Sequence, residues 1–153
     1  MIDAELASAT IAAIATATGG AIGIVRISGR AAEAIAAQLV RPWPSTVESH
    51  RLYLGAVYDA AGARLDEVLV TVMRAPRSFT GETCVELQAH GGKRGLEAIL
   101  QAVLAAGARR ATAGEFTRRA FTAGRIDLTR AEAIAALIGA QSEAALFAAR
   151  AMQ

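Results

Sequence analysis

The 153-residue sequence has only one cysteine and two histidines. The single cysteine, Cys84, excludes an intrachain disulfide and makes a reducing compartment the simpler assumption, so we expect a cytoplasmic protein. Cys84 precedes an apolar strand position, which favours a small buried side chain. His50 and His90 lie far apart in the chain, and no cluster with metal-ligand spacing accompanies them. The sequence therefore predicts no metal site and no cysteine nucleophile.

Aromatic residues are also scarce, at 5% of the chain, which leaves few rings that could stack on nucleic-acid bases. The net charge is only +2, but ten basic and seven acidic side chains lie in residues 77–153. Six arginines account for most of this excess: Arg109, Arg110, Arg118, Arg119, Arg125 and Arg130. We interpret them as a solvated helical face rather than a nucleic-acid patch, because only Phe116 and Phe121 lie nearby and both look like core residues.

The common motifs of nucleotide and peptide chemistry are missing. The segment 90–94 lacks the spacing and the hydroxyl of a phosphate-binding P-loop, and the glycines of 19–23 open no helix, as a dinucleotide fingerprint would require. The chain contains neither a G-x-S-x-G nucleophile elbow nor an H-E-x-x-H zinc motif. We therefore assign no catalytic residue.

One long segment, 6–25, has no charged residue and is long enough to span a bilayer. It consists mainly of Ala, Thr and Gly, with Gly19 and Gly20 near its middle, and no basic region precedes it. Two buried strands joined by a glycine turn fit this composition better, so we expect no membrane association.

Periodicity predicts an α+β fold with a mixed or antiparallel sheet and packed helices. Strands are expected at 10–16, 22–28, 51–59, 66–73 and within 79–92, and helices at 30–40, 92–106 and 116–122. Thr112–Glu115 and Thr129–Glu132 have the form of capping boxes, the second opening a long helix. We expect residues 1–123 to form the compact domain and 124–153 to be the first helix of a helical domain.

Three charged residues are candidates for a binding site. Arg26 lies inside an apolar strand, where an unpaired charge would be costly. Glu86 lies in the middle of another strand, on the face opposite Val85 and Leu87. Arg125 follows a glycine between two helices, from where it can reach across. The pattern alone leaves two simpler interpretations of Glu86, a solvated acid or an internal ion pair with Arg26.

Several blocks occur in order with compact spacing: TIAAIAT, IGIVRISG, LDEVLVTVM, SFTGE, VELQAHGG, GEFTRRAF and GRIDLTRAEAIAALI. From Thr10 to about Met152 the chain resembles the N-terminal region of the tRNA-modification GTPase family known as MnmE or TrmE. The resemblance implies a fold like the folate-binding module of the glycine-cleavage aminomethyltransferase, a homodimer, and a bound 5-formyl- or 5,10-methylene-tetrahydrofolate. It also implies that Arg26, Glu86 and Arg125 contact the folate.

In that family a helical domain interrupted by a Ras-like G domain follows. The protein acts with an MnmG or GidA flavoprotein on the wobble uridine of tRNA, with the folate as presumed one-carbon donor. The G domain is absent here, so we expect this chain alone neither to bind GTP with Mg²⁺ and K⁺ nor to catalyse the modification, and to meet tRNA only indirectly. The turn at 17–21 is shorter than is common in the family and lacks proline. Two alternatives therefore stay open, a structural dimerisation module without folate binding and an aminomethyltransferase-like fragment.

Overall fold

The computed structural model describes residues 2–151, and the surroundings of the side chains over residues 5–140. The elements are α1 (Ile2–Ser8), β1 (Ile11–Ile14), β2 (Ile22–Ser28), α2 (Ala32–Leu39), β3 (Val40–Arg41), β4 (Leu52–Tyr58), β5 (Arg64–Met73), β6 (Cys84–His90), α3 (Lys93–Ala105), β7 (Arg109–Arg110), α4 (Glu115–Thr122) and α5 (Leu128–Ala151). The α+β class predicted from the sequence is therefore confirmed.

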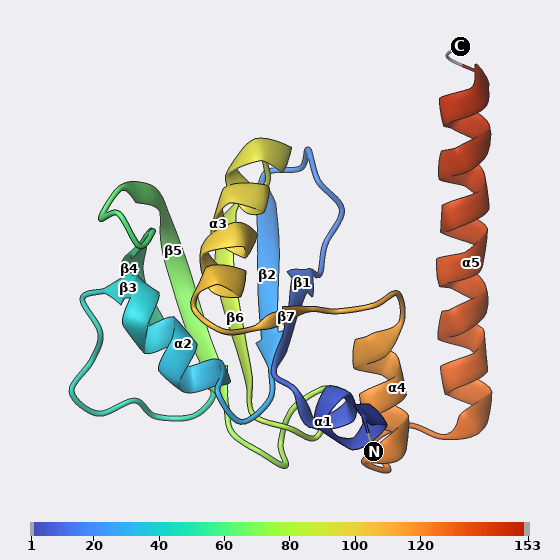
Figure 1. Cartoon of the computed structure of the whole chain (residues 1–153), viewed down its shortest axis with the longest axis horizontal. Coiled ribbons are helices and arrows are strands. Elements are labelled where there is room, and N and C mark those ends of the chain that lie inside the picture. Colours follow the sequence, from blue (N-terminus) through green and yellow to red (C-terminus); the bar gives the residue numbers. More distant parts are fainter. Residues whose placement is uncertain (1, 152–153) are drawn as a thin grey trace.

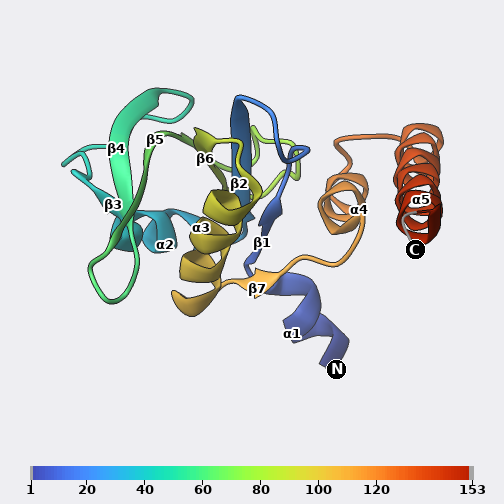
Figure 2. The same cartoon turned by 90° about the horizontal axis from the view of Figure 1, so that it is seen from above.

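The strands form one mixed sheet in the order β3-β4-β5-β6-β2-β1-β7, with the crossovers visible in Figure 1. The pair β1 and β7 is parallel, and the other pairings are antiparallel. Period-two alternation gives the sheet two unlike faces, since Val25 and Leu87 are fully buried while Arg26 and Glu86 project from the opposite face. Helices α2 and α3 lie together over the apolar face (Figure 2).

The packing of α3 on β2 depends on Gly23. A Cβ atom at this position would lie 2.3 Å from Cδ1 of Leu96, which is fully buried. Only a residue without a side chain lets the helix approach the strand this closely. The apolar core is built around this contact and continues through the valines of β5 and β6.

The second face of the sheet is covered only in part. Around Arg26 and Cys84 it is overlaid by residues 76–83 and by α1 and α4, which lie at one end of the sheet (Figure 1). Over the rest of this face several large apolar side chains are exposed: Ile22 at 65%, Leu52 at 55%, Leu54 at 62% and Leu69 at 39%. We call these four residues the open-face patch.

Helix α5 stands to one side of the sheet and is joined to it through α4 (Figures 1 and 2). Ile134 and Ile138 are half-buried, whereas Leu128 and Leu137 are exposed. None of the helices described over residues 2–151 is long and apolar enough to cross a membrane. The uncharged segment 6–25 instead forms the end of α1, the hairpin strands β1 and β2, and the glycine turn between them.

The helix starts differ from the two predicted capping boxes. The carboxylate of Asp127 accepts a hydrogen bond of 2.7 Å from the Arg130 N–H, so α5 begins at Leu128 with Asp127 as its cap rather than Thr129. At α4, the Glu115 carboxylate accepts from the Thr112 N–H at 2.9 Å, which is one half of the predicted box. The helix itself begins at Glu115, and Gly114 occupies the cap position.

Candidate functional site

Arg26 on β2 and Glu86 on β6 lie directly opposite each other in the antiparallel ladder. Nε and Nη2 of Arg26 donate to Oε2 of Glu86, at 3.2 and 3.1 Å. The two side chains are 22% and 18% exposed. The internal ion pair that the pattern allowed is thus present, and it lies at the border of solvent rather than in the core. A fully solvated Glu86 is excluded.

Two phenylalanine rings lie against the guanidinium of Arg26. Its Cζ atom is 5.3 Å from the centroid of Phe79 and 5.3 Å from that of Phe116, within the range of cation–π attraction. Phe79 comes from the segment before β6 and Phe116 from the first turn of α4. Neither is a buried core residue, since Phe79 is 40% exposed and Phe116 is half-buried. Phe121 is exposed at 41%, so the prediction that Phe116 and Phe121 are core residues is wrong.

A cleft of about 590 Å³ opens beside Arg26. One wall consists of residues 13–17, and a second consists of residues 111–114 with Phe116. Ile138 of α5 also belongs to the lining. Thr16, Thr112 and Thr117 add hydroxyl groups to this lining, and Arg26 is the lining residue that carries a charge. The volume suits a small organic molecule. Ala17 belongs to the lining, so the shortened turn at 17–21 begins at the cleft.

Arg125, the third predicted site residue, lies between α4 and α5 as expected. Helix α4 ends with Gly124 in the left-handed region and with the Arg125 N–H bonded to the Ala120 carbonyl at 2.8 Å. Arg125 Nε then donates to the Ser78 carbonyl at 3.0 Å. Among the described contacts Arg125 does not touch Arg26 or Glu86, but it holds the segment that carries Phe79. The structure therefore brings two of the three residues into contact and links the third to them through residues 78–79.

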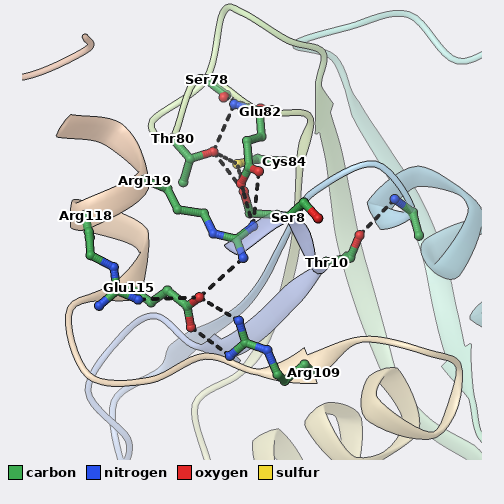
Figure 3. A network of polar contacts seen from close by, with 12 residues as sticks. Ser8, Thr10, Ser78, Thr80, Glu82, Cys84, Arg109, Glu115, Arg118 and Arg119 are labelled. Carbon is green, nitrogen blue, oxygen red and sulfur yellow. Dashed lines mark hydrogen bonds and ion pairs between the residues drawn. The ribbon is translucent and has the colours of Figure 1, made fainter. Parts of the chain in front are cut away.

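A network of charged and hydroxyl side chains joins α4 to the segment before β6 (Figure 3). Glu115 accepts two hydrogen bonds from Arg109, at 3.0 and 2.7 Å, and one of 3.3 Å from Arg119. Arg119 Nη1 also lies 3.1 Å from both oxygens of Glu82. Arg119 is only 8% exposed and Glu115 only 2%. The interpretation of the arginines as a solvated helical face is therefore wrong for Arg119, whereas it holds for Arg118, whose side chain is 65% exposed.

The contacts of Glu115 keep it ionised. Burial acts to raise its pKa, but the hydrogen bonds from Arg109 and from the Thr112 N–H outweigh burial and lower the pKa to about 2. The hydrogen bond to Glu115 also raises the pKa of Arg109. Both ends of this part of the network therefore carry their charge over the whole range in which proteins are usually studied.

Cys84 and His90 make contacts that are typical of residues with a structural role. Cys84 is fully buried, with Thr80 Oγ1 at 3.2 Å from its sulfur. His90 is exposed, and its Nδ1 lies 2.8 Å from Oδ1 of Asp66, which also accepts the His90 N–H through Oδ2 at 2.9 Å. Burial acts to raise the pKa of Asp66, but these hydrogen bonds lower it overall. Within residues 5–140 no three His, Cys, Asp or Glu side chains are grouped as metal ligands would be.

Sequence reasoning missed the parts of the site that depend on tertiary contacts. The aromatic contacts of Arg26 join residues that lie more than fifty positions apart, and no local pattern marks them. The buried pair of Glu115 and Arg119 had a local signal, because a glutamate four residues before an arginine on a helix is well placed for an ion pair.

The chain is similar in sequence to members of one known protein family. Residues 10–125 match the family described as the GTP-binding protein TrmE N-terminus. The chain is 57% identical over 141 residues to a tRNA modification GTPase MnmE of Synechococcus sp. (strain RCC307), covering 89% of this chain and 31% of the relative. It is 53% identical over 139 residues to the protein of the same name from Roseiflexus castenholzii, covering 90% of this chain and 30% of that relative. The chain thus spans about a third of the length of the curated relatives that it matches.

Proposed function

Since this chain belongs to the family of the TrmE N-terminus, the N-terminal domain of the tRNA modification GTPase MnmE, we propose that it binds a reduced folate and forms a homodimer. The ligand we propose is 5-formyl- or 5,10-methylene-tetrahydrofolate, held on a domain that resembles the folate module of the aminomethyltransferase. Its role is to present the one-carbon unit for modification of the wobble uridine. In this proposal the domain acts in the cytoplasm beside an MnmG or GidA flavoprotein, as part of a protein whose G domain uses GTP with Mg²⁺ and K⁺.

One observation carries the proposal: Arg26, which lines a cleft of ligand size, is paired with Glu86. The described hydrogen bonds of Glu86 all use Oε2, and its side chain is 18% exposed. Oε1 is therefore the oxygen with which Glu86 can accept a further hydrogen bond from a ligand. A pterin presents a ring N–H beside an exocyclic amine, and a carboxylate is the group that can accept both in charge-assisted bonds.

The basic and aromatic groups fit the remainder of the molecule. A folate carries carbonyl groups on its reduced ring and carboxylates on its glutamate tail, both of which are acceptors for a guanidinium. Arg26 lies in the cleft, and the exposed Arg125 contacts residues 78–81, the segment that carries Phe79. Phe79 and Phe116 offer apolar ring surface beside the cleft, where a conjugated ligand can pack.

Thermal unfolding with 5-formyltetrahydrofolate tests this proposal. A ligand that binds only the folded state stabilises it by about 2.7 kcal/mol at a hundredfold excess over Kd, so the melting temperature of the wild type should rise by several degrees. Glu86→Gln should remove most of this rise. Glu67→Gln is the matched control, because Glu67 belongs to the same sheet and is exposed. A wild type whose melting temperature stays unchanged would exclude folate binding by this chain.

A dimerisation module without folate binding is the second candidate, and the open-face patch favours it. Leu54 and Leu69 are cross-strand partners on the uncovered part of the sheet, with Ile22 and Leu52 on the same face. Exposed apolar side chains clustered in this way are typical of association surfaces. We propose that a second copy of the chain covers them. Sedimentation should show a concentration-dependent dimer that Leu54→Glu dissociates, and dimerisation without protection by folate would favour this second candidate.

A further inference from the structure

Arg119 is a buried charge whose role is not explained by stability alone. It is 8% exposed, on a short helix, and each of its two terminal nitrogens has an acidic partner. Buried ion pairs often contribute little net stability, because removing two charges from water offsets most of their attraction. The partners of Arg119 show what else it does.

These partners belong to three segments that lie far apart in the sequence. Nη1 of Arg119 donates to both oxygens of Glu82, and Nη2 donates to Oε2 of Glu115 at 3.3 Å and to the Leu6 carbonyl at 3.4 Å. Glu82 in turn accepts from Ser28 Oγ at 2.8 Å. Ser28 follows Arg26 by two residues on the same strand and the same face. The guanidinium of Arg119 therefore joins α4 to the segment before β6 (Figure 3). Through Glu82 and Ser28 it is also linked to the strand of Arg26.

Both rings that contact Arg26 are next to members of this network. Phe116 directly follows Glu115, whose carboxylate is bound by Arg109 and Arg119. Phe79 lies between Ser78, whose hydroxyl donates to the Glu82 carbonyl, and Thr80. Thr80 is fully buried, with its Oγ1 at 2.8 Å from Ser28 Oγ and accepting the Glu82 N–H at 3.2 Å. The network thus holds the residues on both sides of Phe79 and the residue that precedes Phe116.

We propose that Arg119 is a positioning residue of the candidate site: by holding Glu82 and Glu115 together it sets the distance between Phe79 and Phe116, and so the place of the Arg26 guanidinium between them. Arg119 itself lines no part of the cleft. A planar guanidinium with several donors in fixed directions can bind two carboxylates at once, which the single ammonium of lysine cannot reproduce. The shape of the side chain is therefore required as well as its charge.

Fluorine NMR on the full chain tests the positioning directly, because the sequence has only four phenylalanines, Phe79, Phe116, Phe121 and Phe147. With 4-fluorophenylalanine incorporated, and each signal assigned by a Phe→Leu replacement, Arg119→Lys should shift the signals of Phe79 and Phe116. Arg118→Lys is the control on the neighbouring residue, which is 65% exposed and lies 3.7 Å from Glu115. It should leave the signals of Phe79 and Phe116 unchanged.

A second readout rests on the proposed function and uses 5-formyltetrahydrofolate. Its Kd should rise about tenfold in Arg119→Lys and stay unchanged in Arg118→Lys, since a displaced supporting residue weakens a site that it does not touch.

If the wild type does not bind this folate, the proposed function fails while the fluorine signals still decide the role of Arg119. Unmoved signals of Phe79 and Phe116 in Arg119→Lys would overturn the inference, as would equal shifts of these signals in Arg119→Lys and Arg118→Lys. Should this variant not fold, Glu82→Gln breaks the same link, and a shifted Phe79 signal is again the expected result.

Discussion

Two nitrogens of Arg26 donate to a single oxygen of Glu86, so the pair is held at two points on one side and leaves the other carboxylate oxygen available to a ligand. The two residues are direct neighbours across β2 and β6, and both rise from the face of the sheet that α2 and α3 do not cover. The pair is an internal contact of the fold, and its Arg26 lines the cleft. The predictions below separate these two roles.

A double-mutant cycle measures the internal role. Because both side chains are about one-fifth exposed, screening by water reduces their attraction, and we expect a coupling free energy of about 1 kcal/mol between Arg26→Met and Glu86→Gln. Urea unfolding of the wild type, the two single variants and the double variant gives this value. The exposed pair of Arg51 and Glu48, at 66% and 59%, is a suitable reference and should give less. Equal coupling in both pairs would contradict the assigned contact.

The pH dependence of stability should depend on Glu115. Its pKa is about 2 in the folded protein against an ordinary 4.5, so its contribution is complete above about pH 4.5 and is lost as the pH falls toward 2. Between pH 7 and pH 3 this amounts to about 2 kcal/mol. Urea unfolding of Glu115→Gln should therefore show a stability deficit at pH 7 that shrinks by about this amount at pH 3. Asp66, whose pKa is also lowered, contributes in the same direction in both proteins and cancels from the comparison. A stability deficit that does not change with pH would contradict the lowered pKa of Glu115 in the folded protein.

Gly81 and Gly62 form a matched pair for testing how closely residues 78–82 pack on α4. Both have positive φ angles, +81° and +85°, so alanine at either position costs about 1 kcal/mol in backbone strain. At Gly81 an added Cβ would also lie 2.6 Å from Cβ of Ala123, whereas at Gly62 no atom lies within 4 Å. Thermal unfolding should show Gly81→Ala to be less stable than Gly62→Ala by about 1–2 kcal/mol. Weaker folate binding in Gly81→Ala alone should follow, because the same segment carries Phe79. Two variants of equal stability would show that the contact with Ala123 is not tight.

Sequence patterns were sufficient for the parts of the structure with a regular period. The alternation of residues 84–90 placed Glu86 on the face opposite Val85 and Leu87, and the ion pair with Arg26 was among the interpretations that the pattern allowed. The short helix α1 and the two-residue strands β3 and β7 were not foreseen, since elements of this length contain too few residues to show a period.

The site itself required tertiary information. Arg118 and Arg119 are adjacent and identical in type, yet one is exposed and the other buried, and only the packing of α4 against α1 and Glu82 distinguishes them. Phe79 and Phe116 meet Arg26 because the turn at 76–83 and the end of β7 bring their segments together. Neither segment has a hydrophobic period from which the path of the chain could be predicted.

Calorimetric titration with 5-formyltetrahydrofolate tests the central claim, that Glu86 is the acceptor for the ligand in the cleft beside Arg26. The account predicts heat of binding with the wild type, a loss of affinity of tenfold or more in Glu86→Ala, and wild-type affinity in Glu67→Ala. The affinity should fall in Glu86→Ala because the pterin donors would no longer have a charged partner. Glu86→Ala binding as tightly as the wild type would contradict the assignment of the site, and an absence of heat with the wild type would contradict folate binding as a whole.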